Sequence, residues 1–344
     1  MAILNRNQLN HKIVEAVEQH GWKVLYLSNI DKSPFHIRIL NDNNRFTLKI
    51  YMWNLTHGGK KRPADEYRIQ LKGTQFEQGA DFETLVLGWW DDVGVFAGFD
   101  IRKHSGKFGK SPSIQTSQNK LRRAYLNGFS IHNRTNDEIV IAFKPEFFVD
   151  YVQNLRSLHD FGLSLTDTQA LENIIEQTGN EDFVVNDALI APISNPRVQI
   201  TRTITQKVRD NGFQSRILTA YSSKCAFCSI QLKLIDAAHI FPVAEPGSTD
   251  HTFNGIALCS LHHRAFDNAL ITINEKYETL VNESKISWLG SIGHDEGTEK
   301  FINNLRPIIN VPPTKADRPN INFIKQANEL RGWNKTKFII KKTI

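Results

Sequence analysis

The spacing of hydrophobic residues changes along the first hundred residues of this chain. Residues 8–19 (QLNHKIVEAVEQ) carry apolar side chains at helical spacing and are followed by Gly21, which predicts a short first helix. From Val24 to about Phe99, the apolar residues alternate or form short runs between clusters of Asn, Asp and Gly. These runs are FHIRIL, RFTLKIYMW, EYRIQLK, TLVLGWW and GVFAGFDI. This pattern predicts a meander of strands.

Helical and extended patterns are mixed between this predicted sheet and residue 160. We expect a helix at about 119–127, a strand at 138–143 (EIVIAF) and a second helix at 145–158. Strands that are followed by helices of this length are typical of the α+β class. We therefore predict a mixed α/β-sheet domain over residues 1–160.

The rest of the chain divides into a connection and a second domain. Residues 161–200 contain a helical pattern (TDTQALENIIEQT) and then a segment broken by Pro and Asn, which we interpret as a helical linker. The second domain is expected over residues 201–344 and contains all three cysteines. It ends in a helix near 321–331 and a basic tail, KTKFIIKKTI.

Composition excludes several classes of protein. At ~150 residues per domain, 344 residues suggest two domains. No apolar run approaches the ~18 residues of a membrane span, and the amino terminus lacks the apolar core of a signal peptide, so we expect a cytoplasmic protein. Three cysteines are too few for a disulfide framework. The net charge of +6 is compatible with binding nucleic acid but does not by itself indicate it.

The clearest chemistry of the chain lies in residues 224–273. Cys225 and Cys228 form a C-x2-C pair, and Cys259 and His262 repeat the same spacing. Two such pairs supply the four thiolate and imidazole ligands of a tetrahedral structural Zn²⁺. The alternative is an accidental C-x2-C pair together with a cysteine that is buried for packing. That alternative requires a third cysteine and a histidine to agree by chance, so we favour zinc.

A second pattern, His239…Asn254…His263, lies in the same segment. The stretches LIDAAHI and NGIALCSLHHRAFD predict a strand, a loop, a second strand or turn, and a helix. These residues resemble the HNH nuclease family, whose fold is two β-strands and an α-helix around a metal. They are most similar to a branch of bacterial restriction endonucleases with an AAHI…NGIALC..HHRAFD signature. The resemblance is close over residues 224–273 and looser in the flanks.

The resemblance implies a role for each residue of this pattern. His239 matches the general base, which must be a neutral imidazole beside the scissile phosphate. Asn254 matches the residue that orients the loop bearing the base, and His263 matches a ligand of the catalytic divalent ion, Mg²⁺ or Mn²⁺. We expect His262 and His263 to point in different directions, because adjacent helical side chains diverge by ~100°. One can then face the zinc and the other the reaction.

One position departs from the family pattern. Many members place Asp or His immediately before the base as a metal ligand, and here that residue is Ala238. Asp236 lies on the same face of the predicted strand and could supply the carboxylate. Asp267, one helical turn after His263, is a second candidate. Otherwise the ion would depend on His263, water and phosphate oxygens.

A cationic run is the main feature of the amino-terminal half. Residues 101–136 contain eight Lys or Arg and no Asp or Glu, as phosphate contacts require. The alternative is a solvated basic face. We expect this domain to select the DNA by sequence, modification or structure. The predicted DNA-binding residues are Arg102, Lys103, Lys107, Lys110, Lys120, Arg122 and Arg123.

Two further patterns in this half have alternative interpretations. The aromatic residues just before the run could stack on a flipped base or form a sheet core, and we favour the core for the two phenylalanines. They are Trp89, Trp90, Phe96 and Phe99. The stretch ADEYRIQLKG (64–73) resembles the acidic-x-Lys strand of another nuclease class but lacks its proline–aspartate partner.

The sequence therefore predicts a metal-dependent DNA endonuclease of the restriction or genome-defence type. An α+β recognition domain would precede a zinc-stapled ββα-metal (HNH) nuclease domain. One alternative is a zinc-stapled DNA-binding or regulatory protein without catalysis, which the alanine at position 238 favours. Another is an RNA target. Because one HNH centre cuts one strand, cleavage of double-stranded DNA predicts a homodimer.

Overall fold

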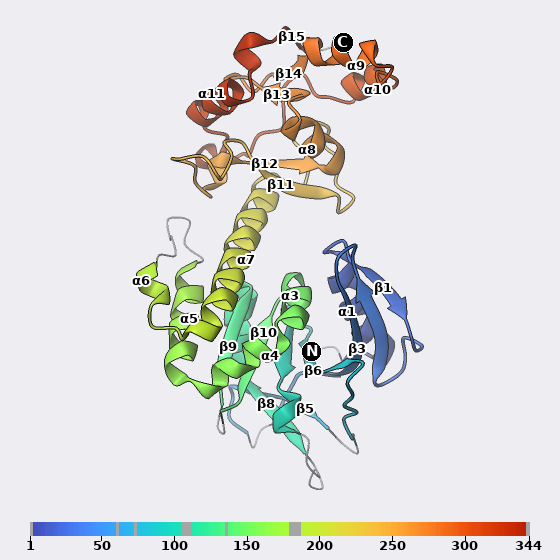
Figure 1. Cartoon of the computed structure of the whole chain (residues 1–344), viewed down its shortest axis with the longest axis vertical. Helices are drawn as coiled ribbons and strands as arrows, with labels where there is room; N and C mark the ends of the chain where they lie inside the picture. The colour runs from blue at the N-terminus through green and yellow to red at the C-terminus, as the bar shows by residue number, and fades with distance from the viewer. Residues whose placement is uncertain are drawn as a thin grey trace. The chain divides into compact units, whose positions relative to one another are not determined.

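The computed structural model describes residues 3–59, 62–71, 74–104, 112–134, 137–178 and 187–341. The described residues form two compact units, which we call unit 1 (up to Val208) and unit 2 (from Arg209). The division falls inside a single helix, α7 (Asn195–Ala220). Figure 1 shows both units, with labels on many of their helices and strands.

Unit 1 contains a seven-stranded mixed sheet in the order β1-β2-β3-β6-β7-β10-β9. Each predicted strand of the first hundred residues is present, and all of them except EYRIQLK lie in this sheet. The bounds are β1 (Lys23–Tyr26), β2 (Phe35–Leu40), β3 (Arg45–Asn54), β6 (Glu83–Trp90), β7 (Val95–Phe99), β9 (Phe129–Asn133) and β10 (Ile139–Phe143).

The prediction of a simple meander is wrong at one place in this sheet. Strands β3 and β6 pair in parallel, with Leu48 opposite Glu83. Parallel neighbours need a long crossover, and the chain between them leaves the main sheet to form it. The crossover contains β4 (Thr56–His57) and β5 (Glu66–Gln70), which join β8 (Ser113–Ser117) in a separate three-stranded sheet.

Helices pack on the sheet of unit 1. The first begins with a capping box, in which Asn5 and Gln8 each accept a hydrogen bond from the backbone of the other. The predicted helix at 145–158 is divided into a 3-10 turn and two short helices. The bounds are α1 (Arg6–Glu18), α2 (Gln118–Asn127), η2 (Pro145–Phe147), α3 (Phe148–Gln153), α4 (Leu155–His159), α5 (Leu165–Thr178) and α6 (Asp187–Ile190), with the 3-10 turns η1 (Ile101–Lys103) and η3 (Asp160–Leu163).

The core of unit 1 includes the aromatic residues that precede the cationic run. Trp89 and Phe96 lie in the larger hydrophobic cluster, and Trp90 and Phe99 lie in a second cluster. All four are at most 4% exposed, so they are core residues and are not available to stack on a base. Ile200, Ile204 and Val208 of α7 also belong to the larger cluster, so this part of α7 packs with unit 1.

Unit 2 is built on a β-hairpin followed by a helix. Strands β11 (Ile235–His239) and β12 (Gly255–Cys259) pair antiparallel, and α8 (Ser260–Asp267) follows directly. This is the predicted strand–strand–helix order. A three-stranded sheet and further helices complete the unit, with bounds β13 (Ile271–Ile273), β14 (Thr279–Asn282), β15 (Phe338–Ile340), α9 (Glu283–Ser291), α10 (Thr298–Asn303) and α11 (Ile321–Leu330), and the 3-10 turns η4 (Thr252–Asn254), η5 (Lys315–Asp317) and η6 (Trp333–Lys335). Over the described ranges, no helix combines the length and apolar character that crossing a bilayer requires.

Candidate metal centre and active site

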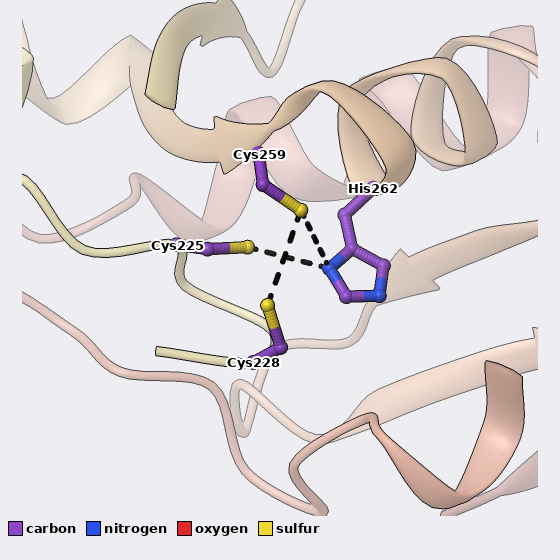
Figure 2. A group of neighbouring side chains, drawn as sticks. All are labelled: Cys225, Cys228, Cys259 and His262. Atoms are coloured by element: carbon purple, nitrogen blue, oxygen red, sulfur yellow. Dashed lines mark hydrogen bonds between the residues drawn. The ribbon is translucent and has the colours of Figure 1, made fainter. Parts of the chain in front are cut away.

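The four predicted zinc ligands converge in unit 2, as Figure 2 shows. Their ligand atoms all lie within 4.8 Å of one another. The sulfurs of Cys225 and Cys259 lie 3.4 and 3.3 Å from His262 Nδ1, and the sulfurs of Cys228 and Cys259 lie 3.9 Å apart. Tetrahedral Zn²⁺ requires about 3.8 Å between two sulfurs and about 3.6 Å between sulfur and nitrogen. The donor set and its spacing therefore fit zinc.

Local backbone structure brings the two ligand pairs together. Cys225 begins a tight turn in which the Ser229 N–H donates to Cys225 O at 2.9 Å and the Cys225 N–H donates to Ile230 O at 2.9 Å. Ser229 has a φ of 65°, which closes this turn. Cys259 ends β12, and His262 lies in the first turn of α8. The hairpin and helix thus supply one pair of ligands and the turn supplies the other.

Burial shifts the ionisation of these ligands. Loss of water raises the pKa of the Cys225 thiol and raises the pKa of Cys228 to about 12. Burial also lowers the pKa of His262 to about 4, so its imidazole is neutral at pH 7 and can offer a lone pair to a metal. Deprotonating buried thiols requires a nearby cation, so folding of this segment would be coupled to the binding of a metal ion.

The predicted base, His239, lies at the end of β11 opposite Gly255 of β12. Its Nε2 is 3.0 Å from Asp250 Oδ1. Its ring stacks on Phe213 of α7, with centroids 3.9 Å apart and planes 4° apart. A side chain on Gly255 would meet Phe213 at 2.9 Å and Ile217 at 2.0 Å, so this glycine permits α7 to pack closely beside His239.

The predicted orienting residue, Asn254, is fully buried beneath the loop that follows His239. Its Nδ2 donates to Thr249 O at 2.8 Å and to Phe241 O at 3.1 Å. Its Oδ1 accepts from the Phe241 N–H at 2.9 Å. One side chain therefore fastens both ends of the loop to each other.

The adjacent histidines of α8 face different surroundings. His262 is fully buried in the cysteine cluster, whereas the His263 side chain is 29% exposed. His263 Nδ1 lies 3.9 Å from Asp236 Oδ2, and its Nε2 lies 3.5 Å from Asp267 Oδ2. Both candidate carboxylates thus lie beside this imidazole, on opposite nitrogens. Among the residues that the structure describes, the cysteine cluster is the group in which three or more ligand atoms converge.

Comparison with known protein families adds to this geometry. A family model described as HNH endonuclease matches residues 225–274, which hold the four predicted zinc ligands, His239, Asn254 and His263. Residues 225–274 form an HNH endonuclease domain. A second model, described as methylase-associated X1, matches residues 46–152 of unit 1. The HNH domain therefore shares its chain with a segment that is similar to the methylase-associated X1 family.

Beyond these two domain matches, the chain as a whole has only weak similarity to the solved structure described next. One matching solved structure is described as a modification-dependent TagI restriction endonuclease. It is 12% identical over 81% of this chain and 80% of that chain, and its TM-score of 0.28 does not establish a common overall fold. No curated protein is significantly similar in sequence to the chain.

The cationic run outside the HNH domain is partly neutralised by the fold. Arg102 pairs with Asp100 and Asp160, at 2.9 and 2.8 Å. Lys120 pairs with Glu172, and Arg123 pairs with Glu172 and Glu176. Lys103 and Arg122 are exposed, and Arg122 lies over the ring of Trp90. Lys107 and Lys110 lie outside the described residues.

The acidic stretch at 64–73 has a structural role that sequence reasoning missed. Asp65 Oδ1 accepts a hydrogen bond from the Asn119 N–H at 2.9 Å, and its other oxygen accepts from the Ser117 hydroxyl. These contacts cap the start of α2. Glu66 lies 3.8 Å from Arg62. The Asp65 carboxylate is thus occupied by contacts within unit 1.

Proposed function

We propose that this chain is a restriction or genome-defence endonuclease that hydrolyses phosphodiester bonds of double-stranded DNA and that unit 1 selects the target. The observation that carries the proposal is the placement of His239 and His263 on a ββα element whose other histidine, His262, joins the cysteine cluster. The methylase-associated match in unit 1 supports a restriction role, because restriction nucleases act alongside DNA methylation.

Each residue of the site has a role in this proposal. His239 takes a proton from the attacking water as general base. Asn254 keeps the loop after His239 closed through its buried hydrogen bonds. His263 and Asp236 would hold a divalent ion, Mg²⁺ or Mn²⁺. When bound, that ion stabilises negative charge on the phosphate and on the leaving oxygen.

The two candidate carboxylates, Asp236 and Asp267, contact different nitrogens of His263. One imidazole binds one ion through one nitrogen, and Asp236 faces Nδ1 of His263 whereas Asp267 faces Nε2. We favour Asp236 because it lies on β11, the strand that also carries His239. An ion held there would lie between the strand that bears the base and the helix that bears His263.

A plasmid-nicking assay with and without Mg²⁺ or Mn²⁺ tests the function. His239→Ala should lower the cleavage rate by roughly 10²- to 10⁴-fold, the usual contribution of a general base. DNA affinity should stay nearly unchanged. His294→Ala is the matched control, since His294 is an exposed histidine of the same unit. Unchanged cutting by His239→Ala would rule out the assignment of the base.

The alternative is a zinc-stapled DNA-binding or regulatory protein without catalysis. Ala238 favours it, because the family's usual metal ligand is missing at that position. DNA binding without nicking in either metal would support this alternative, and nicking of RNA alone would change the substrate. If double strands are cut, we expect a homodimer, which light scattering can detect.

A further inference from the structure

Asp250 links the predicted base to helix α7, although no sequence motif pointed to it. Its Oδ1 lies 3.0 Å from His239 Nε2. Its Oδ2 accepts hydrogen bonds from Arg209 Nε at 3.1 Å and Nη2 at 2.5 Å. The backbone oxygen of Asp250 accepts from Arg216 Nη2 at 2.8 Å. Two arginines of one helix therefore hold the residue that contacts the base.

The charge of Asp250 decides which nitrogen of His239 carries the proton. Hydrogen bonds from His239 and Arg209 hold the pKa of Asp250 at about 2, so the carboxylate is ionised at neutral pH. An ionised carboxylate only accepts hydrogen bonds, so the proton between the two groups belongs to His239 Nε2. The lone pair of the neutral imidazole then lies on Nδ1.

Helix α7 also fixes the plane of the imidazole. Arg209, Phe213 and Arg216 are spaced to share one face of the helix. Phe213 is buried and stacks nearly parallel on His239, while Asp250 holds the edge of the ring. The ring is thus restrained on one face and at one edge, and its Nδ1 lies on the other side of the ring from Asp250.

We propose that Asp250, Arg209 and Phe213 form a positioning assembly that fixes His239 as the Nε2–H tautomer and presents Nδ1 as the base. This inference rests on the proposed function and assigns the reacting atom within it. Nδ1 takes a proton from water, the water oxygen bonds to phosphorus, and the bond from phosphorus to the leaving oxygen breaks. The leaving oxygen takes a proton from solvent. Asp250 stays ionised and stabilises the imidazolium that forms.

Nuclear magnetic resonance tests the tautomer without any cleavage. In the full chain labelled with ¹⁵N-histidine, the His239 signals are those lost in His239→Gln. We expect a protonated Nε2 and an unprotonated Nδ1 in the natural chain, and a loss of this preference in Asp250→Ala. The opposite tautomer, or an unchanged signal in the variant, would overturn the inference. Because this readout needs no activity, it separates failure of the inference from failure of the proposed function.

Two variants with opposite expected effects test the assembly by kinetics. Asp250→Asn keeps the shape but removes the anion that favours a protonated ring, so the acidic limb of the pH–rate profile should move to lower pH. Arg209→Gln removes the cation that competes for Asp250, so the limb should move to higher pH. Arg216, whose guanidinium donates to the backbone oxygen of Asp250, is present in both variants.

The size of the rate effect and the controls complete the test. Asp250→Asn should lower kcat roughly 10²- to 10⁴-fold. Zinc content and DNA affinity should stay unchanged, which shows that the domain is folded. Asp295→Asn, at an exposed aspartate of unit 2, should change neither rate nor profile. If the acidic limbs of the Asp250→Asn and Arg209→Gln profiles shift in the same direction, or do not shift, then Asp250 only supports the loop. Either result would overturn the inference.

Discussion

Two regions were predicted from the sequence to be functional: the zinc segment, residues 224–273, and the cationic run, residues 101–136. In the folded chain, the predicted ligands of the zinc segment converge, whereas several cations of the run form ion pairs with acidic residues. The four predicted zinc ligands converge, because each x2 pair lies in a local turn or at a hairpin–helix junction, and one hairpin joins the pairs. Residues 101–136 contain no Asp or Glu, yet Lys120 and Arg123 of this run pair with glutamates of α5. Ligand spacing encodes local geometry. Charge counted along a chain does not encode the field that results when distant segments pack together.

The strongest test of this comparison removes one zinc ligand. Cys225→Ser should abolish zinc binding and unfold the segment around β11 and α8, because structural zinc contributes about 10–16 kcal/mol in small zinc domains. Unit 1 contains no cysteine, so β3 and β6 should remain protected. Hydrogen exchange with metal analysis measures both effects. Retention of zinc at the natural level would show that Cys225 is not a zinc ligand, and absence of zinc from the natural chain would show that the cluster is only close packing.

A second test distinguishes the predicted roles of the adjacent histidines of α8, His262 in binding zinc and His263 in binding the catalytic ion. His262→Ala should release zinc and destabilise unit 2, because this residue is a buried member of the cluster. His263→Ala should keep zinc and stability but lower cleavage by at least about 10²-fold, because it would remove a ligand of the catalytic ion. Thermal unfolding and the nicking assay separate the two outcomes. Equal loss of zinc in both variants would contradict the division of roles.

Sequence periodicity predicted most strands and the ββα element, and its failures have physical causes. The parallel pairing of β3 with β6 was missed because the strands were taken as consecutive neighbours, whereas β4 and β5 leave for another sheet. The start of helix α7 was interpreted as part of a linker because Pro and Asn break the sequence around Pro196. Proline is tolerated in the first turn of a helix, so Pro196 does not interrupt α7.

The contacts of the predicted base were also beyond the sequence pattern. Asp250 lies in an irregular loop without periodicity, and Phe213 lies on the helix that was missed. By contrast, the adjacent histidines could be assigned to different surroundings from the helical angle alone. Residues on regular elements were thus predictable, whereas residues that meet only through tertiary packing were not.

A third test concerns how the cationic run acts within unit 1. Burial, and then Lys120 and Arg134, lower the pKa of His132 to about 4. The unfolded histidine has a pKa of about 6.5, so below that pH the unfolded chain binds the extra proton. Stability of unit 1 should therefore fall by roughly 2 kcal/mol from about pH 7 to about pH 5 and level off below about pH 4.

Urea unfolding of the natural chain and of His132→Gln measures this effect. Nδ1 of His132 accepts the Ser117 N–H at 3.1 Å, a hydrogen bond that protonation would break. The variant cannot titrate at this position, so its stability should depend less on pH. An equal pH dependence in both chains would show that other groups, such as the buried His159, account for the acid sensitivity.

The smallest expected effect is on the salt dependence of DNA binding. It tests whether ion pairs within unit 1 prevent some cations of the run from contributing to DNA binding. Lys103 is exposed and forms no ion pair with any residue in the described ranges, so Lys103→Gln should weaken DNA binding and reduce the salt slope by about 1. Lys120→Gln should leave the slope nearly unchanged, because Glu172 already neutralises this cation. Fluorescence anisotropy over a range of salt concentrations measures both slopes. If the two variants lower the slope equally, then DNA phosphates displace Glu172 from Lys120, and the charge counted along the sequence describes the bound state better than the free fold does.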